Sequence, residues 1–326
     1  MRFDGSASVQ AMRPNVQARM RTTIPDPMTI PNWPASEARA LFTPTSDPDG
    51  VAIAPRSPIS DAEFILFQKL FHDTIGMHLP PQKKPLVAAR LGRRLEALNL
   101  PTFRHYFEVL RDSSRRDEMQ RAIDLITTNE TSFFREKEHF RVLSEQILPS
   151  IGMRRKVNVW CGAASTGEEP YTLAMVLSDR LGLDGWNLLT TDINSEVLAA
   201  AKNGLYPMAR AKGITETFLK KYCLKGTGSH QGEFLVDSSL RSRVDFRPMN
   251  LMELASEIRD IDIVFLRNVL IYFDVNTKKT ILGKVRQLMK PDGYLFMGAA
   301  ETTLNLDDSF VRMDYQQSGC YKIRGG

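Results

Sequence analysis

The chain has few of the features that mark several common protein classes. Its 326 residues hold only three cysteines, spread too widely for a disulfide framework or a zinc site: Cys161, Cys223 and Cys320. No run of about 18 apolar residues occurs, and the first residues lack the apolar core of a secretory signal. We therefore expect a cytoplasmic protein with no direct membrane insertion.

An excess of charge and a metal-ligand pattern are also missing. The formal net charge of +5 is mild, so it suggests an acidic partner surface without predicting nucleic-acid binding. The histidines do not cluster with cysteines or acids at the spacing of metal ligands, so we expect no metal. We expect a monomer, with no nucleic acid among its partners.

Composition and periodicity divide what is present into regions. Nine of the 18 prolines fall within residues 1–58, so residues 1–57 are expected to be a disordered extension, in which "PASEARALF" is a candidate short helix. Residues 58–128 carry apolar side chains at helical spacing and predict an all-α domain. From about residue 150, strands alternate with helices, which predicts an α/β fold with a doubly wound parallel sheet. A segment at about 223–245 reads as a small antiparallel β-subdomain insertion.

The stretch "VNVWCGAASTGEEPY", residues 157–171, predicts a ligand loop at the end of a strand. It lacks the glycine pattern of a dinucleotide site and the lysine of a phosphate loop. Glu168 and Glu169 would repel a pyrophosphate and tolerate a cationic ligand, while Asp192 ends the next strand and suits ribose hydroxyls. The pattern favours S-adenosyl-L-methionine over a generic nucleotide. Alternatively, the two acids only favour a helix N-terminus.

Further motifs make the chain resemble a known family. "ITTNETSFFRE", "STGEEPY", "TDINSEVLAAAKNGLY", "RNVLIYFD" and "LMKPDGYLFMGAAE" occur in this order, as in the CheR family of chemotaxis receptor glutamate O-methyltransferases. The resemblance covers about residues 58–324. It implies a Rossmann-like class I methyltransferase domain at 150–326, preceded by an all-α N-terminal domain and a linker, 129–149, that contributes to the cofactor site.

The resemblance also implies an activity and a site. The protein would transfer the methyl group of S-adenosyl-L-methionine to glutamate side chains of methyl-accepting chemotaxis receptors, giving methyl esters and S-adenosyl-L-homocysteine. Arg135 and Tyr272 would orient the substrate carboxylate. The cofactor would contact Asn129, Thr131, Arg135, Glu169, Asp192, Asn250, Leu251, Asn268 and Val269. Alternatively, Arg135 only pairs with Glu136 or Glu138, and Tyr272 only packs in the core.

One motif departs from the family pattern. The usual "GHSE" reads "GAAE" here, so Ala299 and Ala300 stand where the family has His-Ser, which puts a role for a histidine at this place in doubt.

Two features are expected to meet partners. Arg90, Arg93 and Arg94 share one face of a predicted helix, which is either a solvated face or a basic stripe that binds acidic receptor methylation helices. The β-subdomain resembles one that, in some family members, binds a receptor C-terminal tail peptide as an added strand. Two other functions remain open: methylation in a non-chemotaxis chemosensory array, and a non-catalytic S-adenosylmethionine-binding signalling module.

Overall fold

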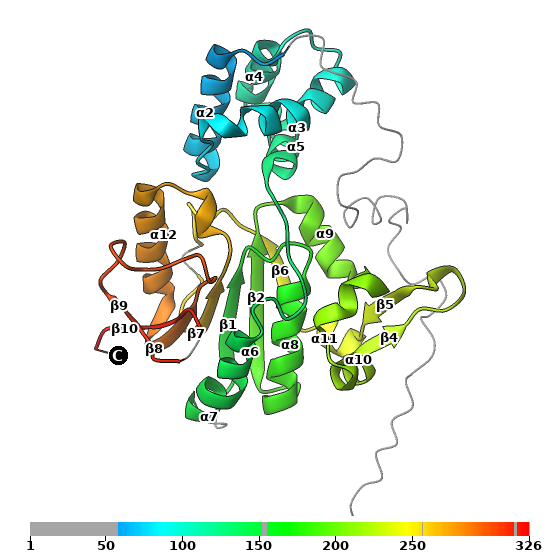
Figure 1. Ribbon diagram of the computed structural model, residues 1–326, viewed down its shortest axis with the longest axis vertical. Helices are drawn as coiled ribbons and strands as arrows, with labels where there is room; N and C mark the ends of the chain where they lie inside the picture. The colour runs from blue at the N-terminus through cyan, green and yellow to red at the C-terminus, as the bar shows by residue number, and fades with distance from the viewer. Residues whose placement is uncertain (1–57, 152–154, 256, 316–317, 326) are drawn as a thin grey trace, which may run out of the picture.

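The computed structural model describes residues 58–151, 155–255, 257–315 and 318–325. The expected extension at 1–57, with its candidate helix, lies outside the described residues. Figure 1 shows a helical domain, in blue and cyan, stacked on one end of a larger domain built on a sheet.

The helical domain contains α2 (Asp61–Ile75), α3 (Lys84–Ala97), α4 (Phe103–Arg111) and α5 (Arg116–Ile126). Helix α2 begins at a capping box, in which Ser60 and Glu63 bond reciprocally, and ends at Gly76, whose φ of 72° suits glycine. The apolar faces of the helices meet around fully buried aromatic side chains, among them Phe67 and Phe103, whose rings pack edge to face.

A buried ion pair holds two of these helices together. Arg94 donates from Nε and Nη2 to the carboxylate of Glu118 at 2.8 and 2.6 Å, and Tyr106 donates its hydroxyl at 2.9 Å. Burial opposes ionisation of Glu118, but the hydrogen bonds from Arg94 and Tyr106 outweigh it and hold its pKa below the ordinary value. Arg94 therefore points into its own domain, which corrects the expected outward stripe at this position.

The larger domain is built on a seven-stranded sheet of order β6-β2-β1-β7-β8-β10-β9. The first five strands in this order are parallel, and the last two are antiparallel to their neighbours. This arrangement confirms the predicted α/β class with a doubly wound sheet. The strands are β1 (Val157–Gly162), β2 (Trp186–Asp192), β6 (Val244–Pro248), β7 (Ile261–Leu266), β8 (Met289–Phe296), β9 (Phe310–Arg312) and β10 (Cys320–Ile323).

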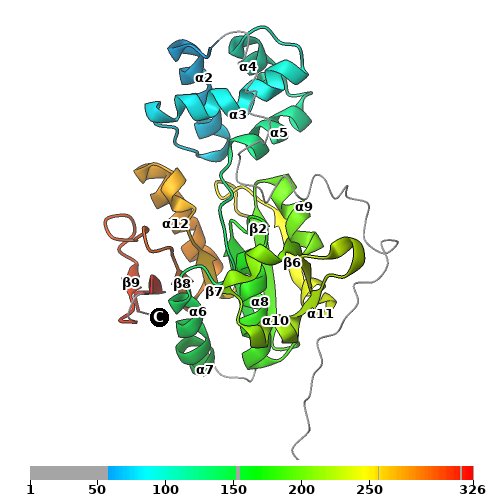
Figure 2. The ribbon, with the colours of Figure 1, turned by 45° about the vertical axis from the view of Figure 1, so that its right-hand side comes forward.

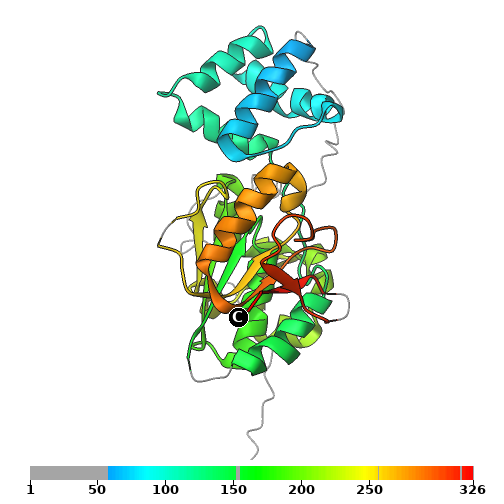
Figure 3. The ribbon, with the colours of Figure 1, turned by 90° about the vertical axis from the view of Figure 1, so that its left-hand side faces the viewer.

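Successive side chains along the strands point to opposite faces of the sheet, and helices pack against both faces. Val159 and Phe265 belong to one core cluster, with helices α6 (Glu138–Val142) and α8 (Glu168–Leu181). Trp160 and Val264 belong to another, with α12 (Val275–Leu288). Helix α12 therefore lies on the opposite face from α6 and α8 (Figures 2 and 3). Helix α7 (Leu148–Ile151) precedes β1 in the chain, and helix α9 (Ser195–Asn203) follows β2.

The small antiparallel sheet has the order β3-β5-β4 and lies apart from the main sheet (Figure 1). Its strands are β3 (Leu205–Pro207), β4 (Cys223–Lys225) and β5 (Glu233–Val236), accompanied by α10 (Glu216–Tyr222) and α11 (Ser238–Arg241). The insertion thus starts earlier than the expected residue 223, because β3 follows the end of α9 directly. It also ends earlier than 245, because β6 pairs in parallel with β2.

Polar contacts fix the two domains against each other. Asp124 of α5 accepts the backbone N–H and the hydroxyl of Ser195 at 2.8 and 2.6 Å, at the first residue of α9. His72 of α2 lies 2.9 Å from Asp274, which caps α12. Asn250 donates its side-chain amide to the carbonyl of Thr74 at 2.9 Å. The helical domain therefore covers the carboxyl ends of the parallel strands.

In the described part of the chain, no helix combines the length and the apolar character that a membrane crossing requires.

Replacing Arg94 with Met should destabilise the helical domain by about 3 kcal/mol, because Glu118 then stays buried with only the more distant and more exposed Arg121, 3.8 Å away, as a cation. The pKa of Glu118 is depressed in the folded chain, so the pair stabilises above pH 4.5 and this contribution is lost as the pH falls. The difference between wild type and variant in thermal or denaturant unfolding should therefore shrink in acid. Arg104→Met, at an exposed ion pair with Glu108, is the matched control and should cost less than about 1 kcal/mol. Equal costs at the two positions would contradict this account.

Candidate active site

A pocket of about 920 Å³, including the space open to solvent, lies between the domains. Its walls come from the end of α2, the linker after α5, and the loops that follow β1, β2, β6 and β7. Ligands in open α/β sheets bind at this edge, outside the carboxyl ends of the strands. The structure gathers here all ten residues predicted to bind the cofactor or to catalyse: Asn129, Thr131, Arg135, Glu169, Asp192, Asn250, Leu251, Asn268, Val269 and Tyr272.

The turn after β1 forms the back of the pocket. Ala163 and Ser165 have φ of 63° and 49°, and Gly167 has φ of 95°. A side chain at position 167 would meet the Tyr206 hydroxyl at 2.7 Å, so the glycine is required both by the backbone and by the space. The turn directs the Ser165 N–H at Asp192, 2.7 Å away.

Asp192 is held in place before any ligand binds. Its carboxylate accepts the backbone N–H groups of Ser165 and Asn194, at 2.7 and 2.9 Å, and its side chain is buried. Burial raises the pKa of Asp192, while the hydrogen bonds from these two amides oppose the rise. The group therefore faces the pocket from the end of β2.

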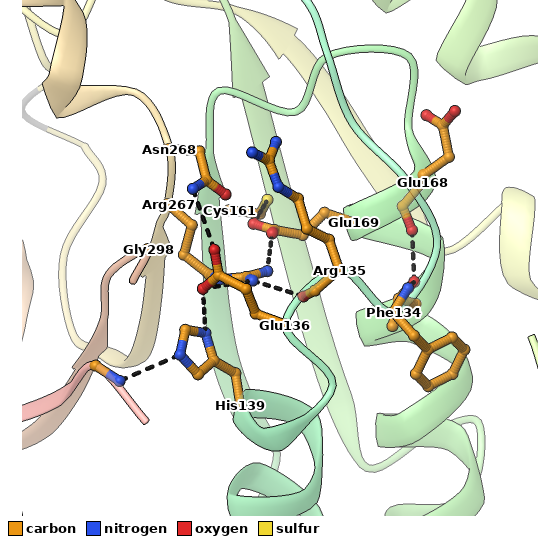
Figure 4. Close-up of polar contacts among 12 residues, drawn as sticks. Phe134, Arg135, Glu136, His139, Cys161, Glu168, Glu169, Arg267, Asn268 and Gly298 are labelled. Atoms are coloured by element: carbon orange, nitrogen blue, oxygen red, sulfur yellow. Dashed lines mark hydrogen bonds and ion pairs between the residues drawn. The ribbon is translucent and has the colours of Figure 1, made fainter. Parts of the chain in front are cut away.

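The two acids of "GEE" have different surroundings (Figure 4). Glu168 is fully buried away from the pocket, where Thr166 donates a 2.6 Å hydrogen bond and Arg210 forms a 2.8 Å ion pair. Glu169 lines the pocket and pairs with Arg267. Glu169 therefore lies in the pocket where the family resemblance places a cofactor contact, whereas Glu168 is paired with Arg210 and does not line the pocket.

Arg267 also lines the pocket, although it was not among the site residues predicted from the motifs. Its side chain is fully buried, and its guanidinium joins Glu169 of α8 to Glu136 of the linker, 3.2 Å away. It also donates to the backbone carbonyl of Arg135 at 2.6 Å (Figure 4). Burial opposes ionisation of Glu136, but the Arg267 charge outweighs it and holds the pKa of that carboxyl below its usual range. The arginine of "RNV" was a signal for this role, although the sequence gives no indication of its partners.

Arg135 is oriented by its own linker. Its Nη1 donates to the Glu130 carbonyl at 2.9 Å, and its side chain extends along the pocket (Figure 4). The alternative that Arg135 only pairs with Glu136 or Glu138 is not what the structure shows. Glu136 faces Arg267, and Glu138 pairs with Arg141 at 2.7 Å. The guanidinium therefore remains in the pocket wall, where it can bind a carboxylate.

Tyr272 lines the pocket rather than packing in the core. Burial raises the pKa of its hydroxyl, and the nearby charges of Arg135 and Arg90 oppose the rise. Tyr272 is therefore a neutral hydrogen-bond donor at neutral pH, close to two cations.

The basic stripe of α3 is divided between two roles. Arg90 donates to the carbonyls of Ile126 and Thr127 at 2.7 and 3.0 Å, which places it at the junction above the pocket. Arg93 is exposed, and Arg94 belongs to the ion pair described above. None of the three lines the pocket itself.

Comparison with known proteins agrees with this geometry. Residues 62–127 match the family model for the CheR methyltransferase all-alpha domain, and residues 129–318 match the one for the CheR methyltransferase SAM binding domain. The chain belongs to the CheR methyltransferase family.

Curated relatives in the CheR family match over most of their length. The chemotaxis protein methyltransferase of Escherichia coli K12 is 40% identical over 78% of this chain and 90% of its own. Chemotaxis protein methyltransferase 2 of Pseudomonas aeruginosa is 35% identical over 79% of this chain and 92% of its own. Solved structures match more weakly: an O-methyltransferase family protein from Burkholderia thailandensis shares 20% identity over 59% of this chain and 43% of its own, with a TM-score of 0.31. The family assignment therefore comes from the family models and the sequence relatives.

The pocket of this CheR chain fits S-adenosylmethionine by its donors and acceptors. Asp192 presents a carboxylate to the pocket, a group that can accept hydrogen bonds from ribose hydroxyls, and the small side chains of Ala163 and Ser165 leave the backbone open to a nucleoside. The charge of Arg267 is matched by two carboxylates, so it does not offer a site for a pyrophosphate. Within the described ranges, no three His, Cys, Asp or Glu side chains come together as metal ligands.

His139 of α6 lies between Glu136 of the linker and Gly319, just before β10, and is almost fully buried. Its Nε2 accepts the Gly319 N–H at 3.1 Å, and its Nδ1 lies 3.5 Å from Glu136. Burial and the charge of Arg267 lower the pKa of His139 to about 4. The histidine is therefore neutral in the folded chain at neutral pH.

This buried histidine should make the CheR fold acid-sensitive. As the pH falls below 6.5 the unfolded chain binds a proton at His139 and the folded chain does not, so stability should drop by about 2 kcal/mol between pH 7 and pH 5. His139→Gln keeps an acceptor for the Gly319 N–H. In unfolding experiments it should remove this part of the pH dependence of the free energy of unfolding. The same change at exposed His105 is the control, and an unchanged slope in His139→Gln would contradict the assignment.

Proposed function

We propose that this protein transfers the methyl group of S-adenosyl-L-methionine to glutamate side-chain carboxylates of methyl-accepting chemotaxis receptors in the cytoplasm. The products are glutamate methyl esters and S-adenosyl-L-homocysteine. The observation that carries the proposal is that Arg135 and Tyr272 line the same pocket as the residues that fit the cofactor. Membership of the CheR family, with relatives that are named chemotaxis protein methyltransferases, supports the substrate class.

The proposed reaction requires the two reactants to be positioned but does not require acid–base catalysis. A glutamate carboxylate is already ionised at neutral pH, so its oxygen needs no general base to become a nucleophile. The bound cofactor supplies an electrophilic methyl group on a cationic sulfur. The protein contributes by holding the carboxylate oxygen in line with that methyl group, at near-attack distance, in a site that excludes water.

Separate residues serve the two reactants in this proposal. Asp192 hydrogen-bonds the ribose, and Asn250, Leu251, Asn268 and Val269 surround the nucleoside. Asn129 and Thr131 contact the cofactor from the linker, and Glu169 contacts it from the start of α8. Arg135 presents a planar fork to the substrate carboxylate, and Tyr272 donates its hydroxyl to the same group. The interaction must weaken as charge leaves the carboxylate, which suits Arg135 because its Nη1 is shared with the Glu130 carbonyl.

The receptor would approach over the junction between the domains. Arg90 is fixed beside Tyr272 and Arg93 is exposed on the same helix, so acidic methylation helices would be attracted to the mouth of the pocket. The small sheet β3-β5-β4 is the proposed place for a receptor tail peptide, as an added strand. No metal is required, and the protein is proposed to act as a monomer.

Tritium-methyl transfer from S-adenosylmethionine to isolated receptor fractions tests the function directly. Label that is released by base as methanol would identify a carboxyl ester. Stable label would indicate another acceptor, and absence of label from every receptor fraction would favour a non-catalytic module.

Arg135→Ala should lower the rate of receptor methylation about 100-fold, because the substrate carboxylate loses its bidentate partner, and Tyr272→Phe about 10-fold. Both rates are measured as initial label transfer at saturating cofactor, beside the melting temperature. Arg141→Ala removes an exposed arginine of α6, which pairs with Glu138 and Glu145, and should leave the rate unchanged. Normal turnover in Arg135→Ala would exclude the role proposed for it.

A further inference from the structure

The carboxylate of Glu301 accepts hydrogen bonds from four backbone N–H groups. Three belong to consecutive residues after β7: Asn268 at 2.7 Å, Val269 at 2.9 Å and Leu270 at 2.7 Å. The fourth belongs to Gly298, after β8, at 2.8 Å. Glu301 ends the "GAAE" motif, which departs from the family pattern at its middle two residues but keeps this acid.

The carboxylate satisfies donors that the sheet cannot. Strands β7 and β8 are parallel neighbours that end side by side, and beyond their ends the amides have no ladder partners. Converging backbone N–H groups of this kind form a site for an anion. Gly298 allows the close approach, since a Cβ there would lie 2.5 Å from the side-chain Nδ2 of Asn268 and 2.9 Å from Glu301 Oε2.

The bonded segment is the wall that faces cofactor and substrate. Asn268 has φ of 56°, a left-handed conformation that must be held by its surroundings. After it, Leu270–Tyr272 forms a 3₁₀ turn that presents Tyr272 to the pocket. Asn268 and Val269 line the pocket as well, whereas Glu301 does not.

We propose that Glu301 is a positioning residue, whose carboxylate sets the Asn268–Tyr272 segment for cofactor binding and methyl transfer. The proposal rests on the proposed function. Both oxygens are in use, since Oε2 accepts from Asn268 and Gly298 while Oε1 accepts from Val269 and Leu270. A glutamine of the same shape would turn an NH₂ group toward two N–H donors, so the segment would have to move.

The test compares Glu301→Gln with Asp262→Asn, at the opposite end of β7. Asp262 is equally part of the β7 framework, because it is buried and accepts the Asn158 N–H at 2.9 Å and the side chains of Arg155 and Lys290. Glu301→Gln should raise the Kd for S-adenosylhomocysteine and lower kcat/KM, each by 10- to 100-fold. Hydrogen exchange should accelerate at the amides of residues 268–270. Asp262→Asn should lower the melting temperature while leaving Kd and kcat/KM within about twofold of wild type.

Two outcomes would overturn the proposal. One is an unchanged Kd and exchange rate in Glu301→Gln, and the other is an equal loss of affinity in Asp262→Asn, which would make Glu301 a general stability contact. Glu301→Asp keeps the carboxylate with a shorter reach, and its Kd and exchange rates should lie between those of wild type and Glu301→Gln. If the glutamine variant does not fold, the same measurements are made on Glu301→Asp. A wild-type protein that binds S-adenosylhomocysteine but methylates no receptor would refute the proposed function, while the binding and exchange data would still decide the role of Glu301.

Discussion

The buried guanidinium of Arg267 is the contact on which the rest of the site depends. An isolated charge in a protein interior is very costly, so Arg267 is tolerated only because Glu136 and Glu169 both face it. These two acids come from the linker and from α8, and the guanidinium itself stands at the end of β7. One charge cluster therefore joins three parts of the chain at the floor of the pocket, and its bond to the Arg135 carbonyl fixes the residue that we assign to the substrate.

The pocket is consequently a product of both domains. The sheet supplies Asp192 and the loops after its strands. The helical domain covers these loops, held by the bond of Asp124 of α5 to the start of α9 and by the bond between Thr74 and Asn250. The charge of Arg90 of α3 acts on Tyr272 of the sheet domain and opposes the rise of its pKa. A helical domain that moved away would therefore expose the cofactor edge of the sheet and separate the two groups near the substrate.

Much of this could be predicted from local patterns, and the remainder depends on pairings between distant residues. Alternating strands and helices predicted the sheet, and the position of Asp192 at the end of a strand predicted its place in the pocket. The partners of charged side chains could not be predicted in this way. Glu168 faces Arg210, Arg94 faces Glu118 and Arg267 faces Glu136, pairs that are separated by many residues and leave no periodic trace. Strand β3 was also missed, because three residues are too few to alternate.

The central claim is that one cofactor site is formed jointly by the linker and the loops after β1, β2 and β7. Hydrogen–deuterium exchange of the full chain, with and without saturating S-adenosylhomocysteine, tests it most directly. We expect the ligand to slow exchange together at residues 127–131, 163–165, 192–194 and 268–270. Protection confined to the sheet loops, with the linker unchanged, would contradict it.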